Sequence, residues 1–504
     1  MNYCILGAAK SGLAATRLAY KINSLNSDSQ NSISLTELND EKNFVDIIDE
    51  LKELDVHYDF GGKAQLPENA ESFLKGCDTL IISPGVPASS VVIQKAISMK
   101  IPVISELEFA YRHLKNPIIA ITGTNGKTTT TSLITFVLNN SGKKAISAGN
   151  IGLPLSDVAL RIIENKQSYG FDNNHSKIFA SKISNSNDFT DNNFTENLLD
   201  ENTIIVVEVS SYQLEFIDTF KPNVAVILNI TPDHLKYHKT FENYVNAKLK
   251  IAKNQTSSDY LILNADDEVL NCKNIAEFQA RTKIKSQIYC FSVSPTNRGI
   301  YIQGENMINA MQQNKEEIMQ IKEIRIPGIH NQYNSMAAGI VSKIWQLTNE
   351  NIRDSLMQFQ GVEHRLEFVK SINGVDFIND SKATNVNASW YALASYTRPI
   401  IWIAGGQGDN NDYSMLDKLV KSNVKKIISF GEEKDAIYSR YSNDIDCSKV
   451  DTLNDAVKLA SKVAIKQDVV LFSPACKSFD QFLNFEQRGE VFKQSVYMLV
   501  TVMN

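Results

Sequence analysis

The sequence predicts an α/β protein with mainly parallel sheets, divided into three domains. Short runs of β-branched residues alternate with helical patterns along nearly the whole chain, which is typical of parallel α/β sheets. Most of these runs are almost entirely apolar, as in strands that are buried on both faces. A length of 504 residues exceeds what one hydrophobic core spans and favours about three domains.

The strand-like runs fall into three groups, and each group predicts one sheet. The first group comprises YCILGA, SISLTE and TLIISPG. The second comprises PIIAITG, TIIVVEVSS, VAVILNI and YLILNADD, and the third VDFINDS, PIIWIAGG, KKIISFGE and DVVLFSPA. We therefore expect domains at 1–110, 111–360 and 361–504. Loops or helix starts follow most of these strands, at the sheet edge where ligands bind in open α/β sheets.

One segment of the second group, residues 165–202, departs from this alternation. It is rich in Asn, Ser and Asp and shows little periodicity. We expect a low-complexity surface insertion in the central domain, partly or wholly disordered, that carries no chemistry.

Composition argues against several classes of protein. A formal net charge of -6 gives no electrostatic basis for binding nucleic acid. No apolar run approaches the length of a membrane span, and the first residues lack the pattern of a signal sequence. The six cysteines are scattered without a C-x-x-C pair, which indicates reduced thiols rather than a disulfide or zinc framework. We expect a soluble, cytoplasmic protein.

The stretch ITGTNGKTTTTSLI begins at Ile121 and joins a strand, a glycine-containing loop and a helix. The usual phosphate-loop pattern G-x-x-x-x-G-K-[ST] is broken, because Ile121 stands in the place of its first glycine. Gly123 and Gly126 nevertheless allow a tight turn that directs N–H groups toward a ligand at the helix start. Lys127 is placed to reach phosphate oxygens, and the hydroxyl of Thr128 to reach Mg²⁺. The alternative is a plain turn before a Thr-rich helix, but the combination favours nucleotide binding.

Three further polar residues follow or end strands of the second group. Glu208 is a carboxylate within an apolar strand, where an unpaired charge is costly, so we expect a metal or another cation beside it. A strand-end salt bridge is the alternative. His234 is by itself more typical of a capping or packing residue than of a ligand. Lys248, in YVNAKLKIAK, is by itself typical of the solvated face of a helix.

The first group carries GAAKSGLAAT, which departs from the dinucleotide pattern G-x-G-x-x-G. Ala9 stands where the second glycine belongs, so we do not expect a redox cofactor. Gly7, Ser11 and Gly12 could still cradle a diphosphate at the start of a helix.

The third group crowds two strand ends with polar residues. Asp380, Ser381, Lys382 and Thr384 follow one strand, and Ser478 lies after the last strand. Either set could consist of helix caps and turns. Two such sets on one sheet edge favour a site for a small polar ligand.

A series of short strings appears in the order typical of the muramyl (Mur) ligase family. These strings are GTNGKTT, GNIG, VEVSSYQLE, TPDHL, NAK, GIHNQYN, HRLE, NDSKATN and SPACKSFDQFLNFEQRG. The chain resembles this family over essentially its whole length apart from 165–202, and the last two strings resemble its D-glutamate-adding members. The shorter phosphate loop, without the distal glycine, is the one that the family uses.

The resemblance implies a three-domain ligase. A Rossmann-like first domain would bind the UDP end of the substrate, a central P-loop-type ATPase domain would bind ATP, and a Rossmann-like last domain would bind ATP and the incoming amino acid. The implied reaction is the ATP-dependent addition of D-glutamate (D-Glu) to UDP-N-acetylmuramoyl-L-alanine (UDP-MurNAc-L-Ala) through an acyl phosphate, in peptidoglycan precursor synthesis. The implied cofactors are ATP, two Mg²⁺ ions and CO₂, the last as a carbamate on Lys248. We expect a monomer that neither binds nucleic acid nor inserts into a membrane.

The same resemblance implies the site residues, string by string. The implied catalytic residues are Lys127, Glu208, His234 and Lys248, and the implied metal ligands are Thr128, Glu208, His234 and Lys248. The implied ATP-binding residues are Gly123, Thr124, Asn125, Gly126, Lys127, Thr128, Thr129, Asn331, Asn334, Arg365, Asp380 and Lys382, together with His364. The implied UDP-substrate residues are Ser11, Gly12, Glu37, Ser83, Gly85 and Asn150, and those for D-glutamate are Thr384, Ser478, Phe479 and Phe485.

Some of these residues have implied roles of their own. Lys127 would clamp the γ-phosphate, and His234 is the candidate base for the amine. Carbamylation would convert the ammonium of Lys248 into an oxygen ligand, which replaces the solvated-face interpretation of this lysine. The acid expected to contact uracil falls at Thr36 or Glu37, and Glu37 is favoured.

One position departs from the family pattern. The glycine-rich string after IAGG usually carries a lysine that pairs with a D-glutamate carboxylate, but here GGQGDNNDY places Asp409 there. An aspartate would repel that carboxylate, so the details of D-glutamate binding differ at this point.

Two alternative functions follow from these strings. One keeps the fold but changes the substrate, to that of another Mur ligase or a folylpolyglutamate-synthase-like enzyme. NDSKATN and SPACKSFDQF argue against it, as does the absence of a D-N-P-R string. The other is a catalytically silent nucleotide-binding regulator. Asp409 is its only support, and the phosphate loop, Glu208 and Lys248 argue against it.

Overall fold

The computed structural model describes residues 1–25, 31–168, 199–270, 272–409 and 411–501. Most of the predicted insertion at 165–202 therefore lies outside the described residues. In the described part of the chain, no helix combines the length and apolar character needed to cross a membrane. The chain forms two compact units, one of Met1–Gln320 with Tyr333–Ser355 and one of Ile321–Gln332 with Leu356–Asn504.

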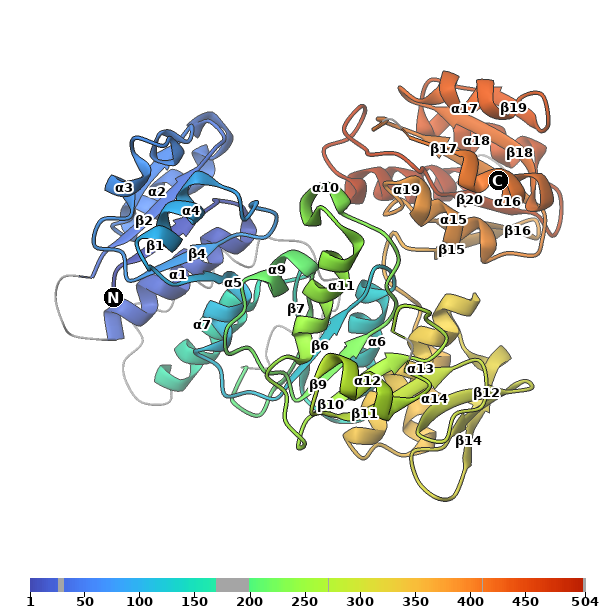
Figure 1. Ribbon diagram of the computed structural model, residues 1–504. Coiled ribbons are helices and arrows are strands. Elements are labelled where there is room, and N and C mark those ends of the chain that lie inside the picture. Colours follow the sequence, from blue (N-terminus) through green and yellow to red (C-terminus); the bar gives the residue numbers. More distant parts are fainter. Residues whose placement is uncertain (26–30, 169–198, 271, 410, 502–504) are drawn as a thin grey trace. The chain divides into compact units, whose positions relative to one another are not determined.

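The first sheet, blue in Figure 1, has five parallel strands in the order β3-β2-β1-β4-β5. Its strands are β1 Tyr3–Leu6, β2 Ile33–Glu37, β3 His57–Phe60, β4 Thr79–Ile82 and β5 Val103–Ser105. The helices are α1 Lys10–Leu25, α2 Val45–Glu53, α3 Ala70–Phe73, α4 Val91–Ser98 and α5 Glu106–Tyr111. Alternate residues of β1 face opposite layers, because side chains of a strand alternate in direction. Tyr3 and Ile5 pack with α1, α2 and α5, whereas Cys4 and Leu6 pack with α3 and α4.

The second sheet has nine strands in the order β14-β13-β12-β11-β10-β9-β6-β8-β7. Its strands are β6 Ile118–Thr122, β7 Ala145–Gly149, β8 Ile204–Glu208, β9 Val224–Ile227, β10 Tyr260–Asn264, β11 Gln287–Ser292, β12 Gly299–Gln303, β13 Asn306–Asn309 and β14 Glu316–Gln320. In this spatial order, all neighbouring strands from β7 across to β12 are parallel, β6 included. The pairs β12–β13 and β13–β14 are antiparallel. β6 lies between β8 and β9, so the segments that follow these three strands meet at one edge.

The helices that accompany this sheet lie between its strands in the sequence or follow its last strand. They are α6 Lys127–Asn140, α7 Leu155–Ser168, α9 Ser211–Glu215, α10 Leu235–His238, α11 Phe241–Leu249, α12 Ile275–Thr282, α13 Ile329–Ile344 and α14 Asn349–Gln358. Every residue of β6 is buried, which agrees with its uninterrupted apolar sequence.

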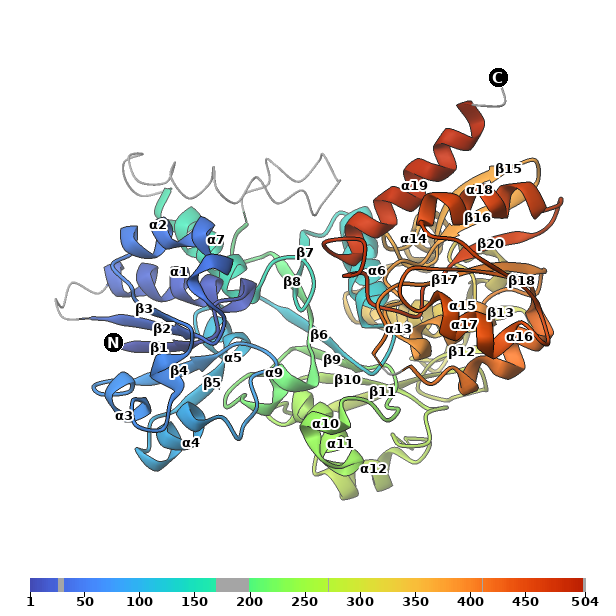
Figure 2. The ribbon, with the colours of Figure 1, turned by 90° about the horizontal axis from the view of Figure 1, so that it is seen from above.

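The third sheet, orange to red in Figures 1 and 2, has six strands in the order β15-β16-β20-β17-β18-β19. Its strands are β15 Glu367–Ile372, β16 Val375–Asn379, β17 Ile400–Gly405, β18 Val424–Phe430, β19 Asp446–Lys449 and β20 Val469–Phe472, of which only β15 is antiparallel to its neighbour. The helices are α15 Val386–Ala394, α16 Asp417–Asn423, α17 Lys434–Tyr441, α18 Leu453–Val463 and α19 Phe485–Thr501. Trp402 packs with α15, α16 and α17, while Ile401 and Ile403 pack on the opposite face with α18 and α19.

The predicted α/β class with mainly parallel sheets is confirmed, and the strand-like runs of each group become strands of one sheet. The first two sheets belong to a single compact unit, in which Arg17 on α1 lies 3.5 Å from Asp157 on α7. The predicted domain boundaries at 110 and 360 stay predictions. No feature of the sequence indicated that Ile321–Gln332 would group with the last unit.

Candidate active site

The loop between β6 and α6 has the tight geometry that its glycines predict. Gly123 and Gly126 have φ angles of 155° and 83°. A Cβ atom on Gly123 would lie 3.0 Å from Leu228 Cβ, and one on Gly126 would lie 2.7 Å from Asn334 Oδ1. A side chain at either position would meet the neighbouring segments. This shape leaves the backbone of the loop at the amino end of α6, as in anion-binding sites.

The residues between these glycines are tied to the segment that follows β9. The Asn125 amide donates to Asn229 Oδ1 at 2.8 Å, and Asn229 Nδ2 donates back to the Asn125 carbonyl at 3.1 Å. Thr124 Oγ1 donates to the Thr231 carbonyl at 3.1 Å. Thr129, also predicted to bind ATP, is buried in the first turn of α6. Asn229 was not predicted as a site residue, although it lies shortly after the apolar run of β9.

Two lysine side chains reach the same carbonyl of this loop. Lys127 Nζ donates to the carbonyls of Gly123 and Thr124, both at 2.9 Å. Lys248 Nζ, from α11, donates to the Gly123 carbonyl at 2.8 Å. The structure therefore brings together two residues that are 121 positions apart (248 minus 127). Both side-chain nitrogens therefore lie beside the loop that would hold phosphate oxygens.

Lys248 is buried, with 2% of its surface exposed, so the solvated-face interpretation is wrong. Its Nζ also lies 4.7 Å from the centre of the Tyr244 ring. Burial and the neighbouring Lys127 lower the pKa of Lys248 well below its ordinary value, while Asp233 and Glu208 act in the opposite direction. The lowered pKa favours the neutral amine form of Lys248.

Glu208 ends β8 beside the loop and is 2% exposed. Its Oε1 accepts a hydrogen bond from Asn150 Nδ2 at 3.0 Å, whereas its buried Oε2 has no hydrogen-bond partner in the described chain. No cation of the described residues forms a salt bridge with Glu208, so the strand-end salt bridge is not formed there. A buried carboxylate oxygen without a donor is costly unless a ligand or metal ion completes it.

This oxygen provides the test of whether the site fits Mg²⁺. Thr128 lies in the first turn of α6 and is mostly buried. A hydroxyl from the phosphate loop and an incompletely bonded carboxylate are the oxygen ligands that Mg²⁺ prefers. The residues present therefore fit a divalent cation.

His234 precedes α10 in a left-handed conformation, with φ of 53°. Its Nε2 lies 3.4 Å from Asp233 Oδ2, and its ring centre lies 5.1 Å from that of Tyr212. Burial lowers the pKa of His234, Asp233 raises it, and Lys127 and Lys248 lower it further. A neutral imidazole can accept a proton or ligate a metal ion. Asp233 was not predicted as a site residue, although it belongs to the string TPDHL.

The two candidates for the uracil contact differ in exposure. Thr36 is fully buried, and its hydroxyl donates to Asp59 Oδ2 at 3.0 Å. Glu37 is 9% exposed, and its carboxylate accepts from the Ala8 amide at 2.8 Å and from Asn39 Nδ2 at 2.8 Å. Glu37, at the end of β2, thus contacts the loop between β1 and α1 through its carboxylate, and its preference over Thr36 as the uracil contact stays a prediction.

The residues predicted for the UDP-substrate site after β1 and β4 differ in their surroundings. A Cβ on Gly12 would lie 1.8 Å from the Gly7 carbonyl oxygen, so Gly12 allows α1 to pack against the end of β1. Ser83 Oγ donates to the same carbonyl at 3.2 Å. Gly85 has a φ of 88°, and a Cβ atom there would meet no other atom within 4 Å. Ser11, in the first turn of α1, is partly exposed.

The two asparagines of α13 are both tied to the protein. Asn334 is 3% exposed, and its Oδ1 accepts from Thr130 Oγ1 at 3.1 Å, next to the phosphate loop. In the second unit, Asn331 Nδ2 donates to the Pro327 carbonyl at 2.7 Å. Both were predicted to bind ATP, and that role stays a prediction.

In the second unit, Asp380 follows β16 and is 3% exposed. Ser473 Oγ donates to its Oδ2 at 2.8 Å, and the Leu366 amide to its Oδ1 at 3.2 Å. Burial raises the pKa of Asp380 to about 6, against the lowering effect of Arg365 and these hydrogen bonds. His364 is 5% exposed, and its Nδ1 lies 3.0 Å from Nδ2 of Asn379.

The first residues of α19 lie at the same edge of the third sheet. Lys382 Nζ lies 5.5 Å from the centre of the Phe485 ring, and Ser381 Oγ donates to the Phe485 carbonyl at 2.8 Å. Arg488 is fully buried, and its guanidinium donates to Ser381 O and Oγ and to the carbonyls of Cys476 and Lys477. Arg488 was not predicted as a site residue, although it belongs to the string FEQRG.

The other residues predicted for D-glutamate differ in exposure. Ser478 is 2% exposed, Thr384 is partly exposed and Phe479 is 63% exposed. Asp409 forms a salt bridge with Lys477, with 3.1 Å between Oδ2 and Nζ. This partner of Asp409 was not predicted, because the two residues lie in loops after different strands.

An additional cluster of possible metal ligands consists of Glu363, His364 and Glu490, whose ligand atoms lie within 4.8 Å of one another. Lys493 Nζ forms ion pairs with both glutamates, at 2.6 Å from Glu490 Oε1. Both carboxylates thus already have a cationic partner in Lys493, and this ion-pair network accounts for the cluster without a metal ion.

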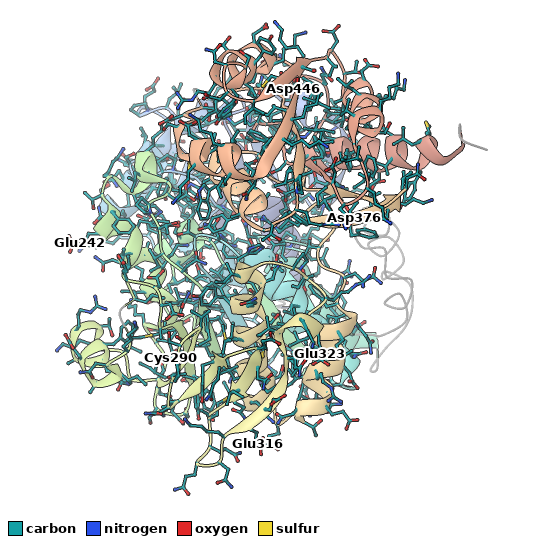
Figure 3. All side chains as sticks on the ribbon, turned by 90° about the vertical axis from the view of Figure 1, so that its right-hand side faces the viewer. Glu242, Cys290, Glu316, Glu323, Asp376 and Asp446 are labelled. Carbon is teal, nitrogen blue, oxygen red and sulfur yellow. The ribbon has the colours of Figure 1, made fainter. Side chains whose placement is uncertain are left out.

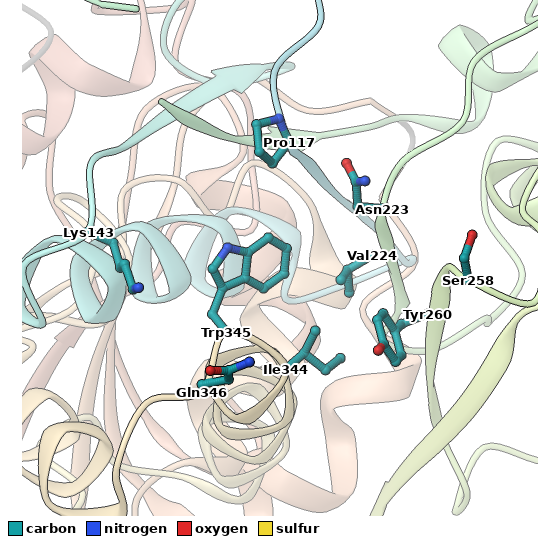
Figure 4. A pocket seen from close by; sticks show the side chains of 9 residues that line it. All are labelled: Pro117, Lys143, Asn223, Val224, Ser258, Tyr260, Ile344, Trp345 and Gln346. Atoms are coloured by element: carbon teal, nitrogen blue, oxygen red, sulfur yellow. The ribbon is translucent and has the colours of Figure 1, made fainter. Parts of the chain in front are cut away.

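A cavity of about 430 Å³ lies at the other edge of the second sheet (Figure 4). Pro117, Asn223 and Ser258 precede β6, β9 and β10, and they line it together with Lys143 and Trp345. The phosphate loop follows the carboxyl end of β6, so this cavity is separate from the predicted ATP site.

Comparison with known proteins identifies the family. The family model described as Mur ligase middle domain matches residues 121–342, and the one described as Mur ligase, glutamate ligase domain, matches 364–476. The UDP-N-acetylmuramoylalanine--D-glutamate ligase of Thermoanaerobacter sp. (strain X514) is 40% identical, over 89% of this chain and 89% of its own. The enzyme of the same name from Salinibacter ruber is 36% identical, over 98% of this chain and 97% of its own.

Solved structures share the fold at lower identity. UDP-N-acetylmuramate-alanine ligase MurC from Thermotoga maritima has a TM-score of 0.54 at 17% identity, over 99% of both chains. MurF ligase from the same organism, in complex with ADP, has a TM-score of 0.54 at 16% identity, over 96% of this chain and 99% of its own. Because two family models and relatives of nearly equal length agree, the chain belongs to the Mur ligase family, as its strings predicted.

Proposed function

We propose that this chain catalyses the ATP-dependent addition of D-glutamate to UDP-MurNAc-L-Ala, in peptidoglycan precursor synthesis. The products are ADP, phosphate and the UDP-linked muramoyl dipeptide. The observation that carries this proposal is the 36–40% identity, across most of the chain, to enzymes named for this reaction. The phosphate loop with Lys127 supports binding of ATP, and the incompletely bonded carboxylate of Glu208 supports a metal site beside that loop.

The proposed chemistry requires activation of a carboxylate. A carboxylate is a poor electrophile, so ATP first converts it to an acyl phosphate, which the amine of D-glutamate then attacks. Phosphoryl transfer asks the protein for positioning and charge neutralisation rather than for a nucleophilic side chain. Lys127 and the loop between Gly123 and Gly126 hold the phosphates in this scheme. His234, whose pKa is lowered, accepts the proton of the amine.

Mg²⁺ is part of the proposal. Thr128 and Glu208 would hold one ion, and His234 and Lys248 would help to hold a second. When bound, the ions neutralise charge on the phosphate oxygens. The unpartnered Oε2 of Glu208 supports the first of these sites.

A carbamate on Lys248 would make this side chain an oxygen ligand. CO₂ combines with a neutral amine, and the lowered pKa of Lys248 favours that form. The test is ¹³C NMR of the protein in labelled bicarbonate. A carbamate signal that is absent from Lys248→Met but present in Lys250→Met supports the assignment, and no signal in the wild type contradicts it.

The remaining assignments complete the substrate sites. The ATP site would include Asn331, Asn334, Arg365, Asp380 and Lys382. The UDP-substrate site would include Ser11, Gly12, Glu37, Ser83, Gly85 and Asn150, and the D-glutamate site would include Thr384, Ser478, Phe479 and Phe485.

We propose that the reaction takes place in the cytoplasm and that the protein is a monomer. The location is supported by the six scattered cysteines, none of which forms a C-x-x-C pair. One of them, Cys290 (labelled in Figure 3), has its sulfur atom 3.3 Å from that of Cys272.

The deciding experiment measures phosphate release with ATP, Mg²⁺ and UDP-MurNAc-L-Ala while D-glutamate, L-glutamate or other amino acids are added in turn. Release that depends on D-glutamate supports the proposal. Turnover with another amino acid, and none with D-glutamate, would assign a different substrate to the last domain.

A further inference from the structure

We infer that Lys477 binds a carboxylate of the acidic amino-acid substrate, beside Asp409. This inference rests on the proposed function and adds a specificity-determining residue to it. Lys477 follows β20 and Asp409 follows β17, and these two strands are hydrogen-bonded neighbours in the third sheet. Both residues thus lie at the carboxyl edge of the sheet, where ligands bind in this class of fold.

The backbones of the two loops are held together. The Gln407 amide donates to the Lys477 carbonyl at 2.9 Å, and the Lys477 amide donates to the Gln407 carbonyl at 3.0 Å. Arg488 Nη1 donates to the Lys477 carbonyl at 3.0 Å from its buried position. These hydrogen bonds fix the backbone of Lys477, and the side chain of Lys477 extends from it to Asp409.

The side chains of this pair are accessible. The exposed fractions are 44% for Lys477 and 61% for Asp409, and Nζ lies 3.1 Å from Oδ2. An ammonium group has three N–H donors, so Lys477 can hold Asp409 and a substrate carboxylate at once. Asp409 then positions the lysine instead of repelling the substrate.

Charge balance supports the same assignment. Glutamate brings two carboxylates, whereas the residues predicted to hold it, Thr384, Ser478, Phe479 and Phe485, are uncharged. The guanidinium of Arg488 is buried, and the hydrogen bonds described above bind it to carbonyl and hydroxyl oxygens. Lys477 is adjacent to Ser478 and offers a solvent-accessible positive charge. A charge-assisted hydrogen bond to a carboxylate is among the stronger polar contacts.

The test measures KM for each substrate in the full-length protein carrying Lys477→Ala. We expect KM for D-glutamate to rise about tenfold or more, as loss of one charge-assisted contact requires. KM for ATP and kcat at saturating D-glutamate should stay within about twofold, since this contact serves ground-state binding. Lys477→Arg retains the charge and should bring most of the affinity back.

Lys449→Ala is the matched control. Lys449 pairs with Asp435 at 2.7 Å and has a 43% exposed side chain, nearly the exposure of Lys477. It lies in β19, at the other side of the sheet from β16. This variant should leave KM for D-glutamate unchanged.

A charge exchange provides the second test. Asp409→Lys combined with Lys477→Ala moves the positive charge to the neighbouring loop and should lower KM for D-glutamate relative to Lys477→Ala alone. An unchanged KM in Lys477→Ala, or an equal rise of KM for all substrates, would overturn the inference. A wild-type protein without D-glutamate-dependent turnover would instead refute the proposed function.

Discussion

The two polar sites of the molecule differ in how their buried charges are satisfied. At the edge formed by β6, β8 and β9, Glu208 has an oxygen without a hydrogen-bond partner in the described chain, and two lysines share the Gly123 carbonyl. At the edge formed by β16 and β20, Asp380 and Arg488 are surrounded by donors and acceptors of the protein. The first arrangement leaves an oxygen that a ligand or cation could bind, whereas the second is satisfied by the protein itself and holds the loops after β16 and β20.

The largest effect should come from Lys127→Ala. Its ammonium supplies charge to the phosphates, so we expect D-glutamate-dependent phosphate release to fall by about 10³-fold or more. The melting temperature should change little, because the hydrogen bonds of Nζ described above go to two carbonyls of its own loop. Lys143→Ala, at the opposite edge of the sheet, should retain activity. Near-wild-type turnover in Lys127→Ala would contradict the ligand-completed character of this site.

Arg488→Ala should mainly affect stability. It removes a buried guanidinium and leaves buried carbonyls without donors, which costs about 3–5 kcal/mol. Arg440→Ala is the control, because Arg440 forms an exposed ion pair with Asp417, and exposed ion pairs contribute little to stability. Chemical denaturation measures both. Equal and small losses would show that Arg488 does not organise the loops after β16 and β20.

The stability of Asp380→Asn should depend on pH in a defined direction. Asp380 has a pKa raised to about 6, so between about pH 4 and pH 6 the folded protein keeps a proton that the unfolded chain releases. The free energy of unfolding therefore falls as pH rises through this interval. Asp380→Asn removes this dependence, and its stability relative to the wild type should increase with pH by about 1–3 kcal/mol.

Melting temperatures of both proteins from about pH 4 to about pH 7, a range that spans both pKa values of Asp380, would measure the difference. A difference that does not vary with pH would mean that Asp380 is not held in the environment described above.

The smallest of these effects concerns the two glycines Gly126 and Gly142. Both have positive φ angles, 83° and 77°, but a Cβ on Gly126 would lie 2.7 Å from Asn334 Oδ1, while one on Gly142 would meet no atom within 4 Å. We expect Gly142→Ala to cost about 1 kcal/mol and Gly126→Ala about 1–2 kcal/mol more. Thermal denaturation measures both costs. Equal values would show that the phosphate loop accommodates a side chain.

Much of the fold could be predicted because its signals are local. The apolar run of β6, the glycines of the loop and the start of α6 all lie between Ile118 and Lys127, and the structure shows them as predicted. The family membership could also be predicted, since it depends on the order of short strings. The roles of the site residues within that family stay predictions.

Other features could not be predicted because they depend on contacts between distant segments. Lys248 has the sequence environment of a surface helix, yet packing against Tyr244 and the loop buries it. Asn229 supports the phosphate loop across 104 positions of the chain. No local pattern indicates either contact.

The sequence by itself determined the α/β class, the phosphate loop and the family, because strand periodicity, turn residues and ordered strings are local properties. Only the tertiary structure decided that Glu208 keeps an incompletely bonded oxygen, that Lys248 is buried, and that Lys477 pairs with Asp409. The physical reason is that solvation and charge pairing depend on which segments meet at a sheet edge, and parallel strands bring together segments that are far apart in the chain.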